Sequence, residues 1–418
     1  MLALGCGLPV RRVASKPLKA MPDGLFAEDR GKLYDVGHVS ATVNAPVYNA
    51  AAGSYDMGSL AQVSLSVPAI AGQVWVYATL NKADEETGIG WRVRGLSPTY
   101  DPLASRVRSG QQVFKLAANI GSTVLNVVVG TGFAGSLQAV QVVAMDAILA
   151  QPFDLYICMG QSQMAATTNA LGVAAELDYC TDPTLLYFPG ASNAGHATVI
   201  GQVEALRAPL QANAESLAGG TVTAGMRSNG VSPAIAFAKL LRQATPSVRN
   251  VVIVQAGVSS TALVGASAAW NPAGSNPFAY THAASLIAGA MAAAPAGSKI
   301  RGVLWAQGES DLAALAGYPA AWAAMRTAFE AIWNANGWVS APVPWIIGTT
   351  PPDAVHANVP AFIDMQSKMD SLSGHATSQP RCRVVNRLPG VEADGVHATA
   401  QSNRWLGNAM AERFLAAQ

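Results

Sequence analysis

The chain has 418 residues, of which 50% are hydrophobic and only 12% are charged. At this length two domains are the default expectation, and the hydrophobic fraction is large enough for a substantial core. The 26 Lys and Arg residues nearly balance the 25 Asp and Glu residues. This balance argues against nucleic acid as the main partner, because binding to phosphates needs a concentrated basic face.

Residues 1–30 carry glycine, proline and basic residues without any periodicity, which predicts a tail or arm. The apolar stretch Met1–Val10 lacks a cationic start and is too short for an ordinary secretory signal. No apolar run reaches the ~18–20 residues that a membrane-spanning helix needs, so we expect no membrane span.

Residues 31–150 contain short runs rich in β-branched residues, separated by Gly, Ser, Asn or Pro. The clearest runs are Val74–Leu80, Gln112–Leu116, Thr123–Val129 and Leu137–Val143. Closely spaced strands without a convincing helix predict a small β-sandwich that forms an accessory domain. Its aromatics Trp75, Trp91 and Tyr100 are interpreted as packing residues, with stacking on a sugar ring as the alternative. Such a module would suit glycan binding or docking onto a larger assembly such as a phage tail. The sequence leaves the location unknown, and we expect an extracellular or virion-associated location rather than the cytoplasm.

Residues 151–418 show a different sequence pattern, in which strand-like and helix-like runs alternate. The predicted strands are Phe153–Met159, Asn250–Gln255, Ile300–Trp305, Val343–Gly348 and Arg383–Asn386. The predicted helices are Ser232–Gln243, Tyr280–Ala294, Ala320–Asn336, Val359–Leu372 and Thr399–Ala417. This alternation predicts an α/β domain with a parallel sheet covered by helices on both faces, whose ligand site lies beyond the carboxyl ends of the strands. The mixed segment Leu171–Gly230 is expected to form loops that shape the pocket.

Two motifs together indicate a serine hydrolase. Ser162 lies in a Gly-containing turn, Met159–Met164, directly after the first of these strands. Asp394 and His397 stand three residues apart near the end of the chain, and of the six histidines only His397 both follows a carboxylate at this spacing and opens a predicted terminal helix. A serine hydrolase needs a hydroxyl on an exposed turn, a base that takes its proton and an acid that orients the base. We therefore expect Ser162 as nucleophile, His397 as base and Asp394 as the orienting acid.

A third motif, Trp305–Asp311 with the sequence WAQGESD, follows another predicted strand, and Ala256–Ser260 forms a Gly-containing turn after the predicted strand that ends at Gln255. With the turn at Ser162 and the terminal DGVH segment, these blocks resemble the sialate O-acetylesterase-like branch of the SGNH hydrolases, a group with many carbohydrate acetylesterases. The resemblance covers roughly residue 152 to the C-terminus. It implies a flavodoxin-like sheet and an oxyanion hole made of the Ser162 and Gly257 backbone N–H groups and the Gln307 side-chain amide.

The chain departs from the family pattern at two places. Gln163 stands where the family usually has Asn after the nucleophile, and Ala165-Ala166 stand where a small Gly-containing segment is common. Glu309 and Asp311 are interpreted as loop anchors rather than as an acid/base pair, because the triad supplies its own acid.

We expect no cofactor and no metal, since the chain has no H-E-x-x-H motif, no His/Cys cluster and no acidic loop of calcium spacing. Cys158 is interpreted as a small core residue, and the sequence leaves open whether Cys180 and Cys382 pair. The leading hypothesis is a serine esterase that removes acetyl groups from a carbohydrate. The alternatives are a general small-ester or lipid esterase of the SGNH class, and a non-catalytic glycan-binding or virion structural protein.

Overall fold

The structure is a computed structural model. It describes residues 32–34, 39–43, 47–49, 54–57, 62–66, 73–82, 91–94, 110–116, 124–129, 135–164, 182–191, 201–206, 214–216, 222–224, 231–245, 247 and 249–418.

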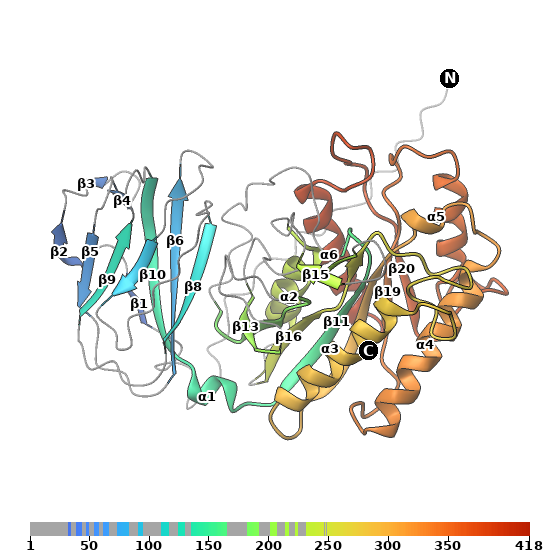
Figure 1. The fold of residues 1–418 in the computed structure, drawn as a ribbon, viewed down its shortest axis with the longest axis horizontal. Coiled ribbons are helices and arrows are strands. Elements are labelled where there is room, and N and C mark those ends of the chain that lie inside the picture. The colour runs from blue at the N-terminus through green and yellow to red at the C-terminus, as the bar shows by residue number, and fades with distance from the viewer. Residues whose placement is uncertain are drawn as a thin grey trace.

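A seven-stranded sheet forms the centre of the C-terminal part (Figure 1). Its order is β13 (Glu204–Ala205), β12 (Leu185–Phe188), β16 (Asn250–Gln255), β11 (Phe153–Gly160), β18 (Lys299–Ala306), β19 (Trp345–Gly348) and β20 (Cys382–Val385). All neighbouring strands are parallel except the antiparallel pair β12 and β13. The five predicted strands are all present. When these five strands are numbered in chain order, their spatial order across the sheet is 2-1-3-4-5, which is the flavodoxin-like order expected from the resemblance.

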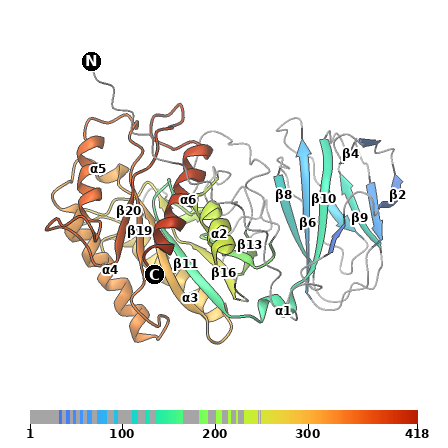
Figure 2. The ribbon, with the colours of Figure 1, turned by 180° about the vertical axis from the view of Figure 1, so that it is seen from behind.

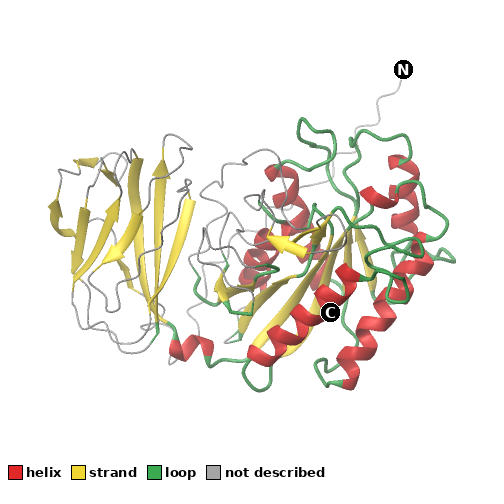
Figure 3. Ribbon diagram, viewed as in Figure 1, coloured by secondary structure: helices red, strands yellow, loops and turns green. Residues whose placement is uncertain are grey.

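Helices cover both faces of this sheet, so the domain has three layers (Figures 1 and 3). The helices α3 (Phe278–Ala293), α4 (Tyr318–Ala335) and α5 (Val359–Lys368) share one core cluster with one face of the strands. The helices α2 (Pro233–Ala244) and α6 (Ala400–Leu415) share a second cluster with the other face, and Figure 2 shows them in front of the sheet. The predicted α/β architecture is therefore confirmed.

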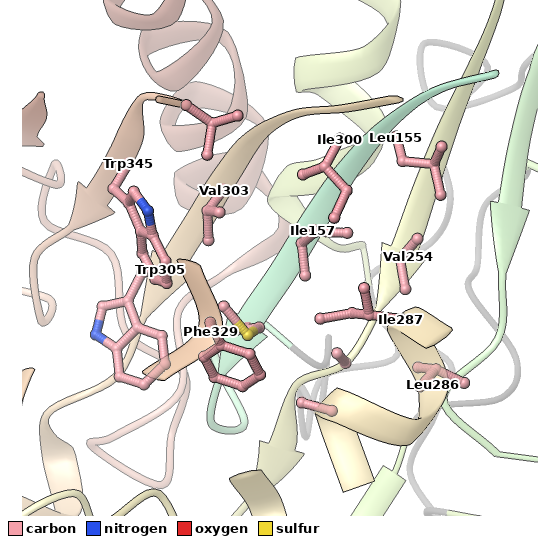
Figure 4. Packing of buried hydrophobic residues seen from close by; sticks show 14 of the residues in the cluster. Leu155, Ile157, Val254, Leu286, Ile287, Ile300, Val303, Trp305, Phe329 and Trp345 are labelled. Atoms are coloured by element: carbon pink, nitrogen blue, oxygen red, sulfur yellow. The ribbon is translucent and has the colours of Figure 1, made fainter. Parts of the chain in front are cut away.

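The central strand β11 is buried from both sides because its side chains alternate between the two clusters. Ile157 points toward α3, where it lies beside Ile287, and Leu155 belongs to the same cluster (Figure 4). Tyr156 and Cys158 point the other way, into the cluster with α2 and α6. A strand buried on both faces reads as a nearly continuous apolar run, which explains why the sequence revealed it.

The C-terminal helix α6 lies very close to α2. A Cβ atom at Gly407 would lie 2.0 Å from the carbonyl oxygen of Pro233, so only glycine permits this approach. Thr399 caps the helix by accepting a hydrogen bond from the Ser402 N–H at 3.2 Å. The packing thus fixes the start of α6, and His397 stands two residues before its cap.

Helix α5 ends at Lys368, four residues before the predicted end. The cause is Asp370, whose carboxylate accepts hydrogen bonds from the N–H of Leu372 and from the N–H of Val384 in β20. These contacts draw the chain away from the helix axis and back to the sheet.

The N-terminal part contains two antiparallel sheets joined to the α/β part through α1 (Asp146–Leu149). One has the order β3 (Val47–Asn49), β4 (Ser54–Met57), β10 (Gly135–Ala144), β6 (Val74–Lys82) and β8 (Gly110–Leu116), with β1 (Lys32–Tyr34) also paired to β10. The other has the order β2 (Val39–Val43), β5 (Gln62–Ser66), β9 (Val124–Val129) and β7 (Trp91–Arg94). Trp75 is buried beside Met145 and Ile148, as the packing interpretation expects. The Trp91 side chain and Tyr100 lie outside the described residues.

A small third sheet has the order β15 (Val222–Ala224), β14 (Ala214–Ser216) and β17 (Val258–Ser259). Most of the predicted loop segment 171–230 lies outside the described residues, as do residues 1–31. Within the described ranges, no helix is both long enough and apolar enough to cross a bilayer.

Candidate active site

Three of the predicted site residues lie just beyond the carboxyl ends of three adjacent strands. Ser162 follows β11, Gly257 follows β16 and Gln307 follows β18, and β11 lies between the other two strands. The strand ends are linked by backbone hydrogen bonds from the Gln161 N–H to the Ala306 oxygen at 3.0 Å and from the Ala256 N–H to the Cys158 oxygen at 2.8 Å. The sheet thus brings Ser162, Gly257 and Gln307 to one rim, as the strand-end rule predicts.

The turn that carries Ser162 depends on Gly160. This glycine has φ +126°, and a Cβ atom there would lie 2.0 Å from the Ala306 oxygen. The turn is closed by the Met164 N–H, which donates to the Gln161 oxygen at 2.9 Å, and is held from below by Gln255 Nε2, which donates to the Met164 oxygen at 2.6 Å. Ser162 itself is 5% exposed. Its Oγ forms no hydrogen bond to His397 or to any other described residue.

Asp394 and His397 are in direct contact, as predicted. His397 Nδ1 lies 2.6 Å from Asp394 Oδ2, and Asp394 Oδ1 accepts hydrogen bonds from the N–H groups of Val396 and His397. Partial burial would raise the pKa of Asp394, but the hydrogen bonds from His397 and Val396 outweigh it and hold the pKa below its ordinary value. Asp394 therefore stays ionised beside the imidazole. With Nδ1 donating to this carboxylate, Nε2 is left as the proton acceptor.

The side chain of Gln163 links the Ser162 turn to the His397 loop. Its Nε2 donates to the Val396 oxygen at 2.7 Å, and its Oε1 accepts from the Ala398 N–H at 3.2 Å. Val396 and Ala398 are the two neighbours of His397 in the chain. The structure therefore joins the two halves of the predicted triad through the residue that follows the nucleophile.

Gln307 is 1% exposed and is held in a polar network. Its Nε2 contacts three acceptors, which are Asp311 Oδ2, the Thr261 oxygen at 3.0 Å and Gln161 Oε1 at 3.2 Å. Its Oε1 accepts from the hydroxyl of Tyr318 at 2.9 Å. An amide nitrogen has two hydrogens, so it cannot satisfy all three acceptors fully at the same time.

Asp311 anchors a loop, as predicted. Besides contacting Gln307, its carboxylate accepts the N–H groups of Leu263 and Val264 at 2.8 and 2.9 Å. Burial raises the pKa of Asp311, and these hydrogen bonds offset only part of that effect. The pair formed by Gln307 and Asp311 thereby holds the segment after β17 against the 3-10 helix η4 (Glu309–Asp311).

Glu309 stands two positions before Asp311, in the same 3-10 helix. Its Oε2 is buried and has no hydrogen-bond partner among the described residues. Burial raises the pKa of Glu309, while a hydrogen bond from its own backbone N–H and the nearby Arg387 guanidinium oppose the shift.

Arg387 is a site residue that the sequence reasoning missed. It is 3% exposed, and burial lowers its pKa to about 10. Its guanidinium donates to the Thr349 oxygen at 3.3 Å, to Asn403 Oδ1 at 2.7 Å and to Gln163 Oε1 at 3.4 Å. Arg387 stands two residues after β20, so the strand-end rule that selected the other site residues would have selected it as well.

The remaining predicted residues fall outside this site. His356 is exposed on a loop, while His196, Cys180 and Ala165-Ala166 lie outside the described residues. Cys158 and Cys382 are buried free thiols, and burial raises the pKa of both. Within the described part of the chain, no three His, Cys, Asp or Glu side chains gather as they would to hold a metal ion.

Residues 152–416 match the model of a protein family described as "Carbohydrate esterase, sialic acid-specific acetylesterase". The match covers the five predicted site residues and Arg387, and it stops short of the N-terminal strands. No curated protein is a match to this chain.

Several solved structures resemble parts of the chain. A protein from Arabidopsis thaliana is 15% identical, with a TM-score of 0.46 over 63% of this chain and 98% of its own. NanS is also 15% identical, with a TM-score of 0.49 over 64% of this chain and 98% of its own. A family two carbohydrate esterase from Clostridium thermocellum, solved with cellohexaose, is 10% identical, with a TM-score of 0.35 over 90% of this chain and 100% of its own.

Proposed function

Because the chain belongs to the carbohydrate esterase family of sialic acid-specific acetylesterases, which are carboxylic ester hydrolases, we propose that it removes acetyl groups from a sugar through an acetyl-Ser162 intermediate. The contact between His397 Nδ1 and Asp394 Oδ2 at 2.6 Å carries the proposal, because it prepares a base on the same rim as the serine. The mechanism uses only groups of the protein and water.

In the first step Ser162 Oγ attacks the carbonyl carbon of the acetyl group, and His397 Nε2 takes the hydroxyl proton. Asp394 stabilises the imidazolium that forms. The tetrahedral intermediate then collapses: the bond between the carbonyl carbon and the sugar oxygen breaks, and His397 returns the proton to that oxygen. The products of this step are the free sugar hydroxyl and acetyl-Ser162.

In the second step water attacks the acetyl carbonyl of the intermediate, and His397 Nε2 accepts a proton from the water. The bond to Ser162 Oγ breaks, the oxygen recovers its proton from His397, and acetic acid leaves. The enzyme returns to its starting state without a net change in charge.

The oxyanion of both tetrahedral intermediates is assigned to three donors. The backbone N–H groups of Ser162 and Gly257 donate no hydrogen bond to a described residue, which leaves them free for an incoming oxygen. The third donor is Gln307 Nε2. Its two hydrogens face three acceptors, so it can exchange its contact with Gln161 or Thr261 for one with the oxyanion.

We also propose that residues 31–150 form a β-rich accessory domain that binds glycan or docks the enzyme onto a larger assembly, that residues 151–418 form the esterase domain, and that residues 1–30 form an arm. The change from antiparallel sheets to a parallel sheet around α1 supports this division. Expression of residues 151–418 alone should give a soluble esterase. Loss of folding in that fragment would contradict the division.

The function is tested by acetate release from O-acetylated sialic acid, from acetylated xylan oligosaccharides and from chromogenic esters of increasing acyl length. We expect hydrolysis of acetyl esters, with the rate falling as the acyl chain lengthens. Equal or faster hydrolysis of long-chain esters would instead identify a lipid or general esterase. Turnover of none of these esters would contradict the enzymatic proposal.

A further inference from the structure

The esterase mechanism leaves one geometric requirement without an assigned residue. Asp394 orients the imidazole of His397, but Asp394 belongs to the same loop as His397 and cannot fix the distance from that loop to Ser162. The loop lies between β20 and α6, whereas Ser162 follows β11. A separate contact must hold the base in line with the nucleophile.

We propose that Gln163 is this positioning residue: its side chain holds the His397 loop in register with Ser162, a role that rests on the proposed esterase function. Gln163 is adjacent to the nucleophile and is 2% exposed. Its amide bridges to the peptide groups on both sides of His397, through the Val396 oxygen and the Ala398 N–H.

The orientation of the amide follows from its three partners. Oε1 faces two donors, the Ala398 N–H and Arg387 Nη1, and Nε2 faces one acceptor, the Val396 oxygen. A flipped amide would set its NH₂ group against two donors and its oxygen against a carbonyl, so only one orientation satisfies the contacts. Arg387, which is held by Asn403 and Thr349, thereby locks the Gln163 rotamer.

The length of the side chain matters for this bridge. Asn, which the family pattern has at this position, is shorter by one methylene, or about 1.5 Å. From the present backbone positions, Asn could not keep both the 2.7 Å and the 3.2 Å contacts within hydrogen-bonding range. The distance between the Ser162 turn and the His397 loop in this chain is therefore one that a Gln side chain can span.

The expected effect is on catalysis more than on substrate binding. Q163L keeps the approximate volume and removes all three hydrogen bonds, which frees the His397 loop to shift relative to Ser162. A misplacement of about 1 Å at a reacting centre can cost on the order of 10²-fold in rate. We expect Q163L to lower kcat by about 10²-fold while KM changes by less than about threefold. Q163N, which keeps both amide groups but falls short, should have a kcat between those of Q163L and the wild type.

The matched control is Q255L. Gln255 is another buried glutamine, and it supports the same turn by donating to the Met164 oxygen at 2.6 Å, whereas no hydrogen bond joins its side chain to residues 394–398. Q255L should lower the melting temperature as Q163L does. If Gln163 acts only through general stability, the two variants will show the same exchange rate at the Ala398 N–H.

Amide hydrogen exchange at Ala398 provides a readout that does not depend on activity. The Ala398 N–H donates to Gln163 Oε1, so it should exchange at least about tenfold faster in Q163L and at the wild-type rate in Q255L. Unchanged protection at Ala398 in Q163L would overturn the proposal, as would a wild-type kcat in folded Q163L or in Q163N. If the wild-type protein hydrolyses no ester, or if S162A hydrolyses as fast as wild type, the proposed function fails instead, and exchange at Ala398 alone then decides whether Gln163 holds the loop.

Discussion

Replacing Gln307 with Ala separates two roles that the structure gives to one side chain. The amide anchors the loop that follows β17 through Asp311 and the Thr261 oxygen, and the proposed mechanism also uses it as an oxyanion donor. Anchoring acts on stability, whereas oxyanion donation acts on the transition state. The variant should therefore show two losses that can be measured independently.

The size of the stability loss follows from the contacts. Q307A leaves the buried Thr261 oxygen without this donor, at about 1–3 kcal/mol, and removes one of the two donors to Asp311 Oδ2, which keeps the Leu263 N–H, at about 1–3 kcal/mol for a hydrogen bond to a charged group. The hydroxyl of Tyr318 keeps a second acceptor, the Gln307 backbone oxygen at 3.0 Å, so it adds little. The unfolding free energy should fall by about 2–6 kcal/mol. For a domain of this size the melting temperature should fall by roughly 2–4 °C per kcal/mol.

The catalytic loss is expected to be about 10²–10³-fold in kcat, because a neutral donor is removed from the oxyanion while the two backbone donors remain. The assay is steady-state hydrolysis of a chromogenic acetyl ester, corrected for the folded fraction and combined with thermal denaturation of the same preparation. Q366A is the matched control. Gln366 is buried and donates to the Gln307 backbone oxygen at 3.1 Å, but the proposed mechanism gives its side chain no contact with the reacting atoms. Q366A should be destabilised with a much smaller loss of kcat. Wild-type kcat in folded Q307A would refute oxyanion donation, and an unchanged melting temperature would refute anchoring.

Two further predictions follow from the site. G160A should lower the unfolding free energy by more than about 3 kcal/mol and abolish activity, because the added Cβ would lie 2.0 Å from the Ala306 oxygen in a backbone conformation that favours glycine. Chemical denaturation measures the loss. A G160A variant of wild-type stability would contradict the close approach of residue 160 to the Ala306 oxygen. Because burial raises the pKa of Asp311 above its ordinary value of 3.8, the folded state keeps a proton that the unfolded chain has lost, so this contribution to stability falls as the pH rises from 3.8 through the folded pKa. The difference in unfolding free energy between wild type and D311N should therefore shrink over that pH range, and a difference independent of pH would contradict the raised pKa.

The fold of the C-terminal part could be predicted from sequence because its strands are buried on both faces. Strands such as Phe153–Gly160 and Asn250–Gln255 appear as apolar runs bounded by turn residues. The edge strand β13 and its neighbour β12 were missed because they are short and lie in a segment of mixed composition for which loops were expected. The early end of α5 was missed because it depends on Asp370 binding a strand 14 positions away.

The contact between Asp394 and His397 could be predicted because it is local, with the two residues three positions apart. The strand-end rule placed Ser162, Gly257 and Gln307 on one rim. The bridge from Gln163 to Ala398 spans 235 positions and the contact from Arg387 to Gln163 spans 224, and no local pattern encodes contacts of that kind. The sequence marked Gln163 only as a departure from the family pattern, and the structure supplies the contacts that give the extra methylene a physical reason.

Trapping the acetyl-enzyme tests the central claim most directly. The wild-type protein is mixed with an excess of acetyl ester and quenched in acid within the first turnovers, and its peptides are then analysed by mass spectrometry, with S162A treated in parallel. We predict an acetyl adduct on the peptide that contains Ser162, no adduct in S162A, and a hydrolysis rate in S162A lower by about 10⁴–10⁶-fold. An acetyl group on a different residue, or near-normal turnover by folded S162A, would contradict the assignment of Ser162 as the nucleophile.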